Sequence, residues 1–405
     1  MKTIRGGVTA PIGFTASGVH CGIRKNKEKK DLALVWSEKD CAAAAVYTTN
    51  KVVGQPLIVT KEHLADGKAR AIIVNSGNAN TCTGEQGVAD ARRMAALVAE
   101  RLPIAAKDVV VASTGVIGVP LDVSVIEAKM DELVAGLSKG GSIDAREAIM
   151  TTDTMKKEAA LSEDIGGKTV TIGAMAKGSG MIHPNMATML GFITTDCAIS
   201  PALLQKALSS TVKRTFNRVS VDGDTSTNDM VVVLANGMAG NPEIIAEGED
   251  YRDFAEALDW VCTELARMIA RDGEGATRLI ECNVTGASDE DDAEAFAKAV
   301  ISSSLVKTAM FGSDANWGRV LCALGYSGPS FDPDKVDLAF ESPRGYIEVC
   351  KAGAPLPFSE DKAKKILSDR EVQILVSLNG GEGEATAWGC DLSYEYVKIN
   401  GDYRT

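Results

Sequence analysis

Short apolar runs separated by glycine and polar residues fill the first part of the chain, from Val8 to Ile58. The best strand candidates there are Leu32 to Trp36 and Ala42 to Thr48, and Ala71 to Val74 follows as a further apolar run. Runs of four to eight residues rich in β-branched and small apolar side chains, bounded by turn residues, are typical of strands. The pattern therefore predicts a hairpin-rich N-terminal region.

Apolar residues recur at helical spacing in several later segments. This 3.6-residue period predicts helices that bury one face. The segments are 87–102, 144–150, 202–216, 252–271 and 317–324. Ser200 and Pro201 stand before the third segment and suit an N-cap and a first helical residue.

Strand-like patterns return between the helical segments and near the C-terminus. Residues 168–175 and 189–193 predict two strands, the second of them buried. Val372 to Leu378 alternates between apolar and polar positions, and residues 379–381 are Asn-Gly-Gly. That turn sequence predicts a hairpin whose second strand is 385–399.

A glycine-containing segment follows the predicted strand Val109 to Ala112. Ser113, Thr114 and Gly115 are expected in a loop, where glycine lets the backbone come close to a reacting carbonyl group. A free backbone N–H in such a place can stabilise an oxyanion. Without further information a Thr-Gly step indicates only a turn.

The stretch from Lys177 to Asp196 carries the strongest chemical signal. Its first half is a polar loop rich in glycine, and its second half is apolar, so Thr188 is expected where a loop enters a strand. Threonine needs a base to act as a nucleophile, and the α-amine of an N-terminal threonine can be that base, with a reference pKa of about 7.7–8.0. Cleavage between Ala187 and Thr188 would create both groups, although an Ala-Thr step is also ordinary at a strand.

Composition limits the function classes. The 405 residues carry a net charge of −12, and the single basic cluster, Arg24 to Lys30, is interrupted by Glu28, so a nucleic-acid partner is not expected. Nine scattered cysteines without a Cys-x-x-Cys pair support neither a zinc site nor a disulfide framework. No apolar stretch approaches 18 residues and the N-terminus has no signal-like apolar region, so we expect no membrane association and a cytoplasmic protein.

Two loops invite a ligand-binding interpretation. Asp222 to Asp229 is dense in acids and hydroxyls, but it lacks the ligand spacing of a calcium loop, so a polar loop beside the site is favoured. Asp272 to Gly275 is rich in glycine, but it follows a helix instead of opening one, which disfavours phosphate binding. We therefore expect no metal site.

The order of residues from Lys177 to Leu190 closely resembles the self-cleavage segment of the ArgJ family. Members of this family are the ornithine acetyltransferases, or glutamate N-acetyltransferases, of arginine biosynthesis. The resemblance spans nearly the whole chain in one order. The other matching motifs are Asn75 to Asn80, Ser113 to Gly118, Thr151 to Thr154, Asp272 to Thr277 and Asn400 to Thr405.

The resemblance implies a mixed α/β (α+β) fold. It predicts a layered αββα body and a smaller C-terminal α/β domain at about 285–405. It also predicts self-cleavage into residues 1–187 and 188–405, and assembly of two copies of each fragment into a heterotetramer. Composition alone supports only a mixture of helices and strands.

The resemblance also assigns roles to individual residues. Thr188 is the expected nucleophile, and Thr114 and Gly115 are the expected oxyanion hole. The expected substrate contacts are Thr154, Lys177, Thr188, Glu274, Asn400 and Thr405. No cofactor is implied beyond acetyl-CoA as a second acetyl donor, and no nucleotide motif separates the family forms that use acetyl-CoA from those that do not.

The implied reaction moves the acetyl group of N2-acetyl-L-ornithine to L-glutamate through an acetyl-threonine. Three alternatives remain open. One is a self-processing amidohydrolase or aminopeptidase of similar architecture, and another is an uncleaved hydrolase in which His183 activates a nucleophile. The third is an amino-acid-binding protein without chemistry, which the Ala187-Thr188 step and Thr114-Gly115 disfavour.

Overall fold

The structure is a computed structural model that describes residues 1–183 and 189–402, and these residues form two compact units. The first unit contains residues 1–178, 189–217 and 225–265. The second unit contains residues 179–183, 218–224 and 266–402. The chain therefore leaves the first unit twice before it finally enters the second.

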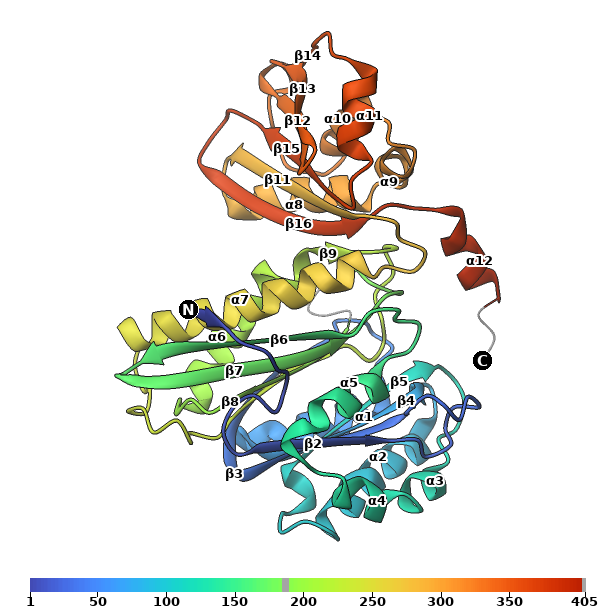
Figure 1. Ribbon diagram of the computed structural model, residues 1–405, viewed down its shortest axis with the longest axis vertical. Coiled ribbons are helices and arrows are strands. Elements are labelled where there is room, and N and C mark those ends of the chain that lie inside the picture. The colour runs from blue at the N-terminus through green and yellow to red at the C-terminus, as the bar shows by residue number, and fades with distance from the viewer. Residues whose placement is uncertain (184–188, 403–405) are drawn as a thin grey trace. The chain divides into compact units, whose positions relative to one another are not determined.

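One continuous set of strands forms the framework of the first unit (Figure 1), in the order β1-β6-β7-β8-β10-β3-β4-β5 with β2 paired to β3. The bounds are β1 Lys2–Thr3, β2 Phe14–Val19, β3 Leu32–Tyr47, β4 Lys68–Asn78, β5 Val109–Val116, β6 Lys157–Ile165, β7 Lys168–Lys177, β8 Leu190–Thr195 and β10 Met230–Ala235. The first half of β3 pairs with β2 and β4, and its second half pairs with β10, while the pairing with β4 resumes at Cys41 and Ala42.

The two strands predicted at 32–36 and 42–48 are thus one strand. The polar residues between them, Glu38 to Asp40, are exposed and shift the register between Trp36 and Cys41 without turning the chain. Because β3 belongs to both halves of the strand set, the two halves can lie face to face as a pair of sheets.

The paired sheets enclose an apolar core. Alternate residues of a strand point to opposite faces, and here the even-numbered residues of β4 and β5 face the second sheet. The core residues that come from the two sheets include Ile72, Val74, Val110, Ala112, Met175, Leu190, Phe192, Met230 and Val232. The odd-numbered residues of the same two strands pack instead against helices.

Helices cover both outer faces of the paired sheets, which gives the layers of an αββα body (Figure 1). One layer is α1 Gln55–His63, α2 Gly84–Ala99, α3 Val123–Glu127 and α4 Met130–Ala135. The other layer is α6 Pro201–Arg214 and the first part of α7 Glu249–Arg271, while α5 Ser142–Ile149 packs against β2, β3, β4 and β7. The predicted cap of α6 is confirmed, with Ser200 at the N-cap and Pro201 in the first turn. The predicted layered fold class is confirmed.

A seven-stranded sheet with helices packed on it forms the second unit. Its strand order is β14-β13-β12-β15-β11-β16-β9. The strands are β9 Val219–Ser220, β11 Leu279–Ala287, β12 Asp337–Ser342, β13 Gly345–Lys351, β14 Ala354–Pro355, β15 Glu371–Ser377 and β16 Gly383–Cys390. The helices are α8 Glu290–Ser302, α9 Ser304–Phe311, α10 Trp317–Gly325, α11 Glu360–Leu367 and α12 Tyr394–Asp402.

The predicted C-terminal hairpin is wrong. β15 and β16 do not pair with each other, because β11 lies between them, parallel to β15 and antiparallel to β16. The predicted return strand 385–399 also ends at Cys390, and helix α12 follows it. Residue 285, near which we expected the domain to begin, lies inside β11, and the unit already includes the chain from Ala266 onward.

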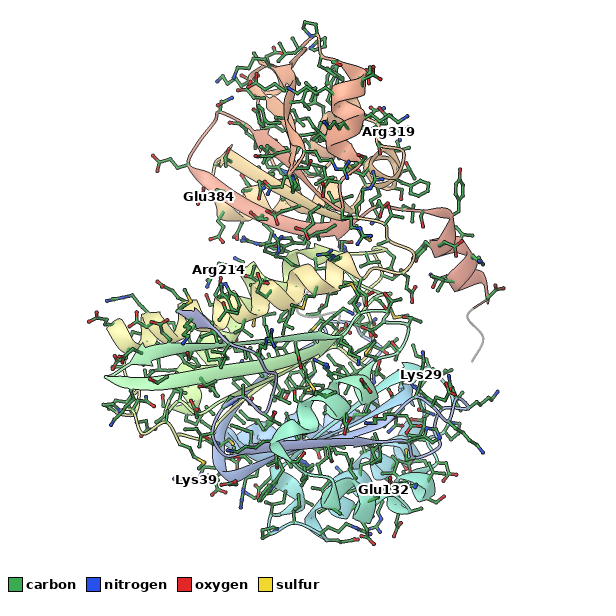
Figure 2. All side chains as sticks on the ribbon, in the orientation of Figure 1. Lys29, Lys39, Glu132, Arg214, Arg319 and Glu384 are labelled. Carbon is green, nitrogen blue, oxygen red and sulfur yellow. The ribbon has the colours of Figure 1, made fainter. Side chains whose placement is uncertain are left out.

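Charged side chains occupy the outer surface of the layers. Lys39 and Glu132 are exposed and point away from the first unit (Figure 2). Among the described residues, no helix is long and apolar enough to cross a membrane.

The core between the paired sheets can be tested at Phe192. Its side chain is fully buried, so we expect Phe192→Ala to lower the free energy of unfolding by about 3–5 kcal/mol. Ile245→Ala is the control, because 74% of that side chain is exposed and the change should stay within about 0.5 kcal/mol. Urea unfolding followed by circular dichroism measures both. A loss below about 1 kcal/mol for Phe192→Ala would contradict this description of the core.

Candidate active site

Three neighbouring strands of the first unit have an end at the same place. Lys177, the last residue of β7, pairs with Leu190, the first residue of β8, and Leu190 pairs with Met230, the first residue of β10. Ala187 and Thr188, where cleavage is expected, lie outside the described residues. Leu190 follows Thr188 by two residues in the sequence, so the chain enters this strand end directly after the expected nucleophile.

Thr114 and Gly115 lie in strand β5 and not in a loop as predicted. They pair with Ser76 and Gly77 of β4. The register of the two strands shifts at this point, and the pairing continues into the glycine-containing segment. Gly115 has a φ of +138°, and a Cβ atom on it would lie 2.3 Å from the carbonyl carbon of Gly77. Only glycine fits this close approach without displacing the backbone. The glycine is therefore required by the pairing of the two strands.

Lys177 is buried and reaches the expected oxyanion hole. Its Nζ lies 3.4 Å from Oγ1 of Thr114. Burial lowers the pKa of Lys177, while the negative charges of Asp153 and Asp229 act in the opposite direction. Two residues that the family resemblance selected separately, Thr114 and Lys177, are thus hydrogen-bonded to each other.

Asp153 anchors the backbone next to Lys177. Its carboxylate accepts hydrogen bonds from Nζ of Lys157 at 2.7 Å, from the amide of Gly178 at 2.7 Å and from the amide of Thr151 at 2.9 Å. Burial favours the neutral acid, but the charges of Lys157 and Lys177 hold the pKa of Asp153 well below its usual range. Asp153 therefore fixes the turn on which the exposed Thr154, an expected substrate contact, is located.

Asp229 is a second buried acid at the same strand end. It directly precedes Met230, whose amide donates to the carbonyl oxygen of Met189. Its Oδ2 has no hydrogen-bond partner among the residues that the structure describes. Burial raises the pKa of Asp229 well above its usual value, and the charge of Lys177 opposes that shift. The sequence indicated only a polar loop here, although the step from acid to apolar strand at Asp229-Met230 was visible.

Two expected substrate contacts lie together in the second unit. Nδ2 of Asn400 donates to Oε2 of Glu274 at 2.8 Å, and the amide of Glu274 donates to the carbonyl of Ser179 at 2.7 Å. A Cβ atom on Gly180 would lie 2.3 Å from Cδ of Glu274, so the missing side chain leaves the space that the carboxylate occupies. Thr405, the third expected contact at the C-terminus, lies outside the described residues.

His183 lies in a loop of the second unit that is held by hydrogen bonds. Its Nδ1 lies 3.0 Å from Oγ of Ser220, and burial lowers the pKa of the ring. Asp222 accepts hydrogen bonds from the amides of Met181 and Ile182 and holds the same loop. Within residues 1–183 and 189–402, no group of three or more histidine, cysteine or acidic side chains is arranged to hold a metal ion.

Sequence reasoning found only part of these groups. It selected Thr114, Gly115, Lys177 and Thr154 in the first unit and Glu274 and Asn400 in the second. It missed Asp153, Lys157 and Asp229, as well as Asn228, whose amide group bonds to the carbonyl of Ser113 next to Thr114. Such buried charges and amides are recognised by their partners, which are distant in sequence.

The layered αββα body, with polar side chains collected at one end of its paired sheets, defines a mixed α/β protein with a candidate active site at that end. The sequence model described as the ArgJ family matches residues 15–405. The chain therefore belongs to the ArgJ family.

Known relatives agree with this assignment. The chain is 57% identical to the arginine biosynthesis bifunctional protein ArgJ of Symbiobacterium thermophilum, over 100% of both chains. A solved ArgJ structure from Bacillus halodurans is 50% identical with a TM-score of 0.51, and it covers 53% of this chain and 100% of the solved one. An ornithine acetyltransferase structure from Mycobacterium tuberculosis, solved with ornithine, is 42% identical and covers 46% of this chain and 99% of the solved one, with a TM-score of 0.43. This chain is an acetyltransferase of arginine biosynthesis.

The anchoring role of Asp153 can be tested by Asp153→Asn. We expect a loss of about 3–5 kcal/mol in the free energy of unfolding at pH 7, because the buried ammonium of Lys157 loses its counter-charge. The double variant Asp153→Asn with Lys157→Met should recover most of that loss, and the exposed Asp164→Asn is the control.

The stability difference between the wild type and Asp153→Asn should depend on pH. The pKa of Asp153 is lowered on folding, so its stabilisation is complete above the unfolded pKa of about 3.9 and is lost as the pH falls further. The difference between wild type and Asp153→Asn should therefore shrink below about pH 4. Urea unfolding at pH 7 and pH 3 measures it, and an unchanged difference would show that the carboxylate charge is not what stabilises this turn.

Proposed function

We propose that this protein cleaves itself before Thr188 and then transfers the acetyl group of N2-acetyl-L-ornithine to L-glutamate by a ping-pong mechanism. The observation that carries the proposal is the meeting of Lys177 and Thr114 at the strand end that the chain enters two residues after Thr188. Acyl transfer needs a nucleophile beside donors for the developing oxyanion. Thr114 is hydrogen-bonded to Lys177 at this strand end, and Gly115 is the next residue in the chain.

The first stage is maturation. Oγ of Thr188 attacks the carbonyl carbon of Ala187, the peptide nitrogen leaves as the amine of Thr188, and water opens the resulting ester. The fragments are residues 1–187 and 188–405. The second fragment has 218 residues, or about 54% of the chain, and the solved relative from Bacillus halodurans matches 53% of this chain over its whole length. The agreement between these two lengths supports a cleavage near Thr188.

The second stage is transfer. Oγ of Thr188 attacks the acetyl carbonyl of N2-acetyl-L-ornithine while its own α-amine takes the hydroxyl proton. Thr114 and Gly115 stabilise the oxyanion, and L-ornithine leaves with a proton on its amine. The amine of L-glutamate then attacks the acetyl-threonine, and N-acetyl-L-glutamate is released. Because the same threonine serves both substrates, the two half-reactions share one oxyanion hole.

The remaining expected contacts bind the amino-acid substrates. We assign this role to Thr154, Lys177, Glu274, Asn400 and Thr405, together with Thr188. The contact between Asn400 and Glu274 supports a shared task for that pair, because the amide directs one carboxylate oxygen and leaves the other available to an ammonium group.

Acetyl-CoA, assembly and location complete the proposal. The relative from Symbiobacterium thermophilum is named bifunctional, which supports a second activity, and we assign that activity to acetylation of glutamate by acetyl-CoA. No other cofactor takes part. The two fragments stay together as a heterotetramer with two copies of each, and the enzyme acts in the cytoplasm.

Self-cleavage is tested with Thr188→Ala. Removal of the hydroxyl group should leave one full-length chain on a denaturing gel and abolish acetyl transfer, while Thr188→Ser should still be processed, more slowly. Mass spectrometry of the wild type should give a fragment that begins with Thr188. Two fragments from the alanine variant would show that another residue performs the cleavage.

The order of the transfer is tested by kinetics. A covalent acetyl-enzyme predicts parallel double-reciprocal lines when acetylornithine and glutamate are both varied. The second acetyl donor is tested by replacing acetylornithine with acetyl-CoA in the same assay. Intersecting lines would favour direct transfer, and acetate as the main product would favour the self-processing amidohydrolase alternative.

A further inference from the structure

Strand β5 is at the end of the strand order of the first unit, so one of its edges has no partner strand among the described residues. Side chains satisfy the backbone groups on that edge instead. Oγ1 of Thr60 accepts from the amide of Val111 at 2.9 Å and donates to its carbonyl at 2.7 Å. Nδ1 of His63 lies 2.8 Å from the carbonyl of Val109. Odd-numbered residues of β5 therefore present their backbone groups to this edge.

Asn228 continues this series at Ser113. Its Nδ2 donates to the carbonyl of Ser113 at 3.0 Å and to that of Ala79 at 2.6 Å. Its Oδ1 accepts from the hydroxyls of Thr81 at 2.5 Å and Thr227 at 2.6 Å. The side chain is buried, and all of its hydrogen-bonding positions are used on four different residues. Such a saturated amide has one orientation.

The next residue in the series is Gly115. Backbone groups of alternate residues share one edge of a regular strand, and Gly115 is the next odd-numbered residue of β5 after Ser113. We propose that Asn228 is a positioning residue for the oxyanion hole. It fixes the carbonyl of Ser113 and thereby the direction of the Thr114 and Gly115 donors. This inference rests on the proposed function, in which those two residues stabilise the oxyanion.

The position of Asn228 in the chain explains why its hydrogen bonds matter for the site. Asn228 precedes β10, whose first residue, Met230, pairs with the first residue of β8, Leu190. The hydrogen bonds of Asn228 thus join the sheet that contains the strand after Thr188 to the edge of the sheet that contains Thr114. Oxyanion donors act only when they are held in place before the charge develops. A small rotation of the Ser113 carbonyl would therefore matter more for the transition state than for substrate binding.

The test compares two variants on the same edge of β5. Asn228→Asp keeps the shape and the acceptor atom, but it places an oxygen against the carbonyls of Ser113 and Ala79. Thr60→Val, the matched control, removes the hydroxyl that serves Val111, two residues before Ser113. Both should lower the thermal midpoint. Asn228→Asp should lower kcat for acetyl transfer on the order of 100-fold with little change in KM, whereas Thr60→Val should keep a kcat close to that of the wild type.

Two readouts separate this inference from the proposed function. Acetyl transfer by the wild type tests the proposed function. Hydrogen–deuterium exchange of peptides covering residues 112–118 tests the positioning role even if the wild type transfers no acetyl group. Exchange should rise in Asn228→Asp and stay unchanged in Thr60→Val. A wild-type kcat in Asn228→Asp, an equal loss of kcat in both variants, or unchanged exchange in Asn228→Asp would overturn the proposal.

Discussion

The burial of the Lys177 ammonium is the constraint on which the arrangement of this site depends. An ammonium group removed from water loses several kcal/mol of solvation unless nearby charges and dipoles replace it. In this unit the replacement comes from Asp153, Asp229 and the hydroxyl of Thr114. Each belongs to a different segment, so the strand end is stable only when all of these segments are in place together.

The two acids meet this constraint in different ways. Asp153 accepts hydrogen bonds from two backbone amides and from Lys157, and these bonds stabilise its negative charge. Asp229 retains an oxygen without a partner among the described residues, and its pKa is shifted toward the neutral acid while that of Lys177 is shifted toward the neutral amine. Asp153 thus has the character of a structural anchor. For Asp229 and Lys177, burial opposes the charge, and the attraction between the two groups acts against that effect.

Local patterns in the sequence predicted the elements well and their pairing poorly. Helical spacing located α2, α6 and α7 to within a few residues, because amphipathic periodicity is a property of the segment alone. The alternation in 372–378 likewise predicted β15. It could not show that β11 separates β15 from β16, because that pairing depends on a strand about 90 residues earlier in the chain. The Asn-Gly-Gly turn therefore favoured a hairpin that does not form.

The same division applies to the candidate site. Thr114, Gly115 and Lys177 were accessible through motifs, since each lies in a distinctive short segment. Asp153 was adjacent to a selected residue, yet its importance lies in its bonds to Gly178 and Lys157, which no pattern in Thr151 to Thr154 reveals. Buried polar groups are specified by mutual satisfaction, so they emerge only once the fold has brought their partners together.

The shared strand β3 explains why distant segments can satisfy one another at this site. Its first half lies in the sheet of Thr114 and its second half in the sheet of Lys177, so bending one strand brings the two sheets face to face. The apolar residues between the sheets set their separation, and the polar residues at the sheet ends set their alignment. Close-packed cores resist sliding because side chains interdigitate. Atomic alignment of a hydroxyl with an ammonium at the sheet ends therefore depends on the packing of the core together with the hydrogen-bonded loops around Asp153 and Asn228.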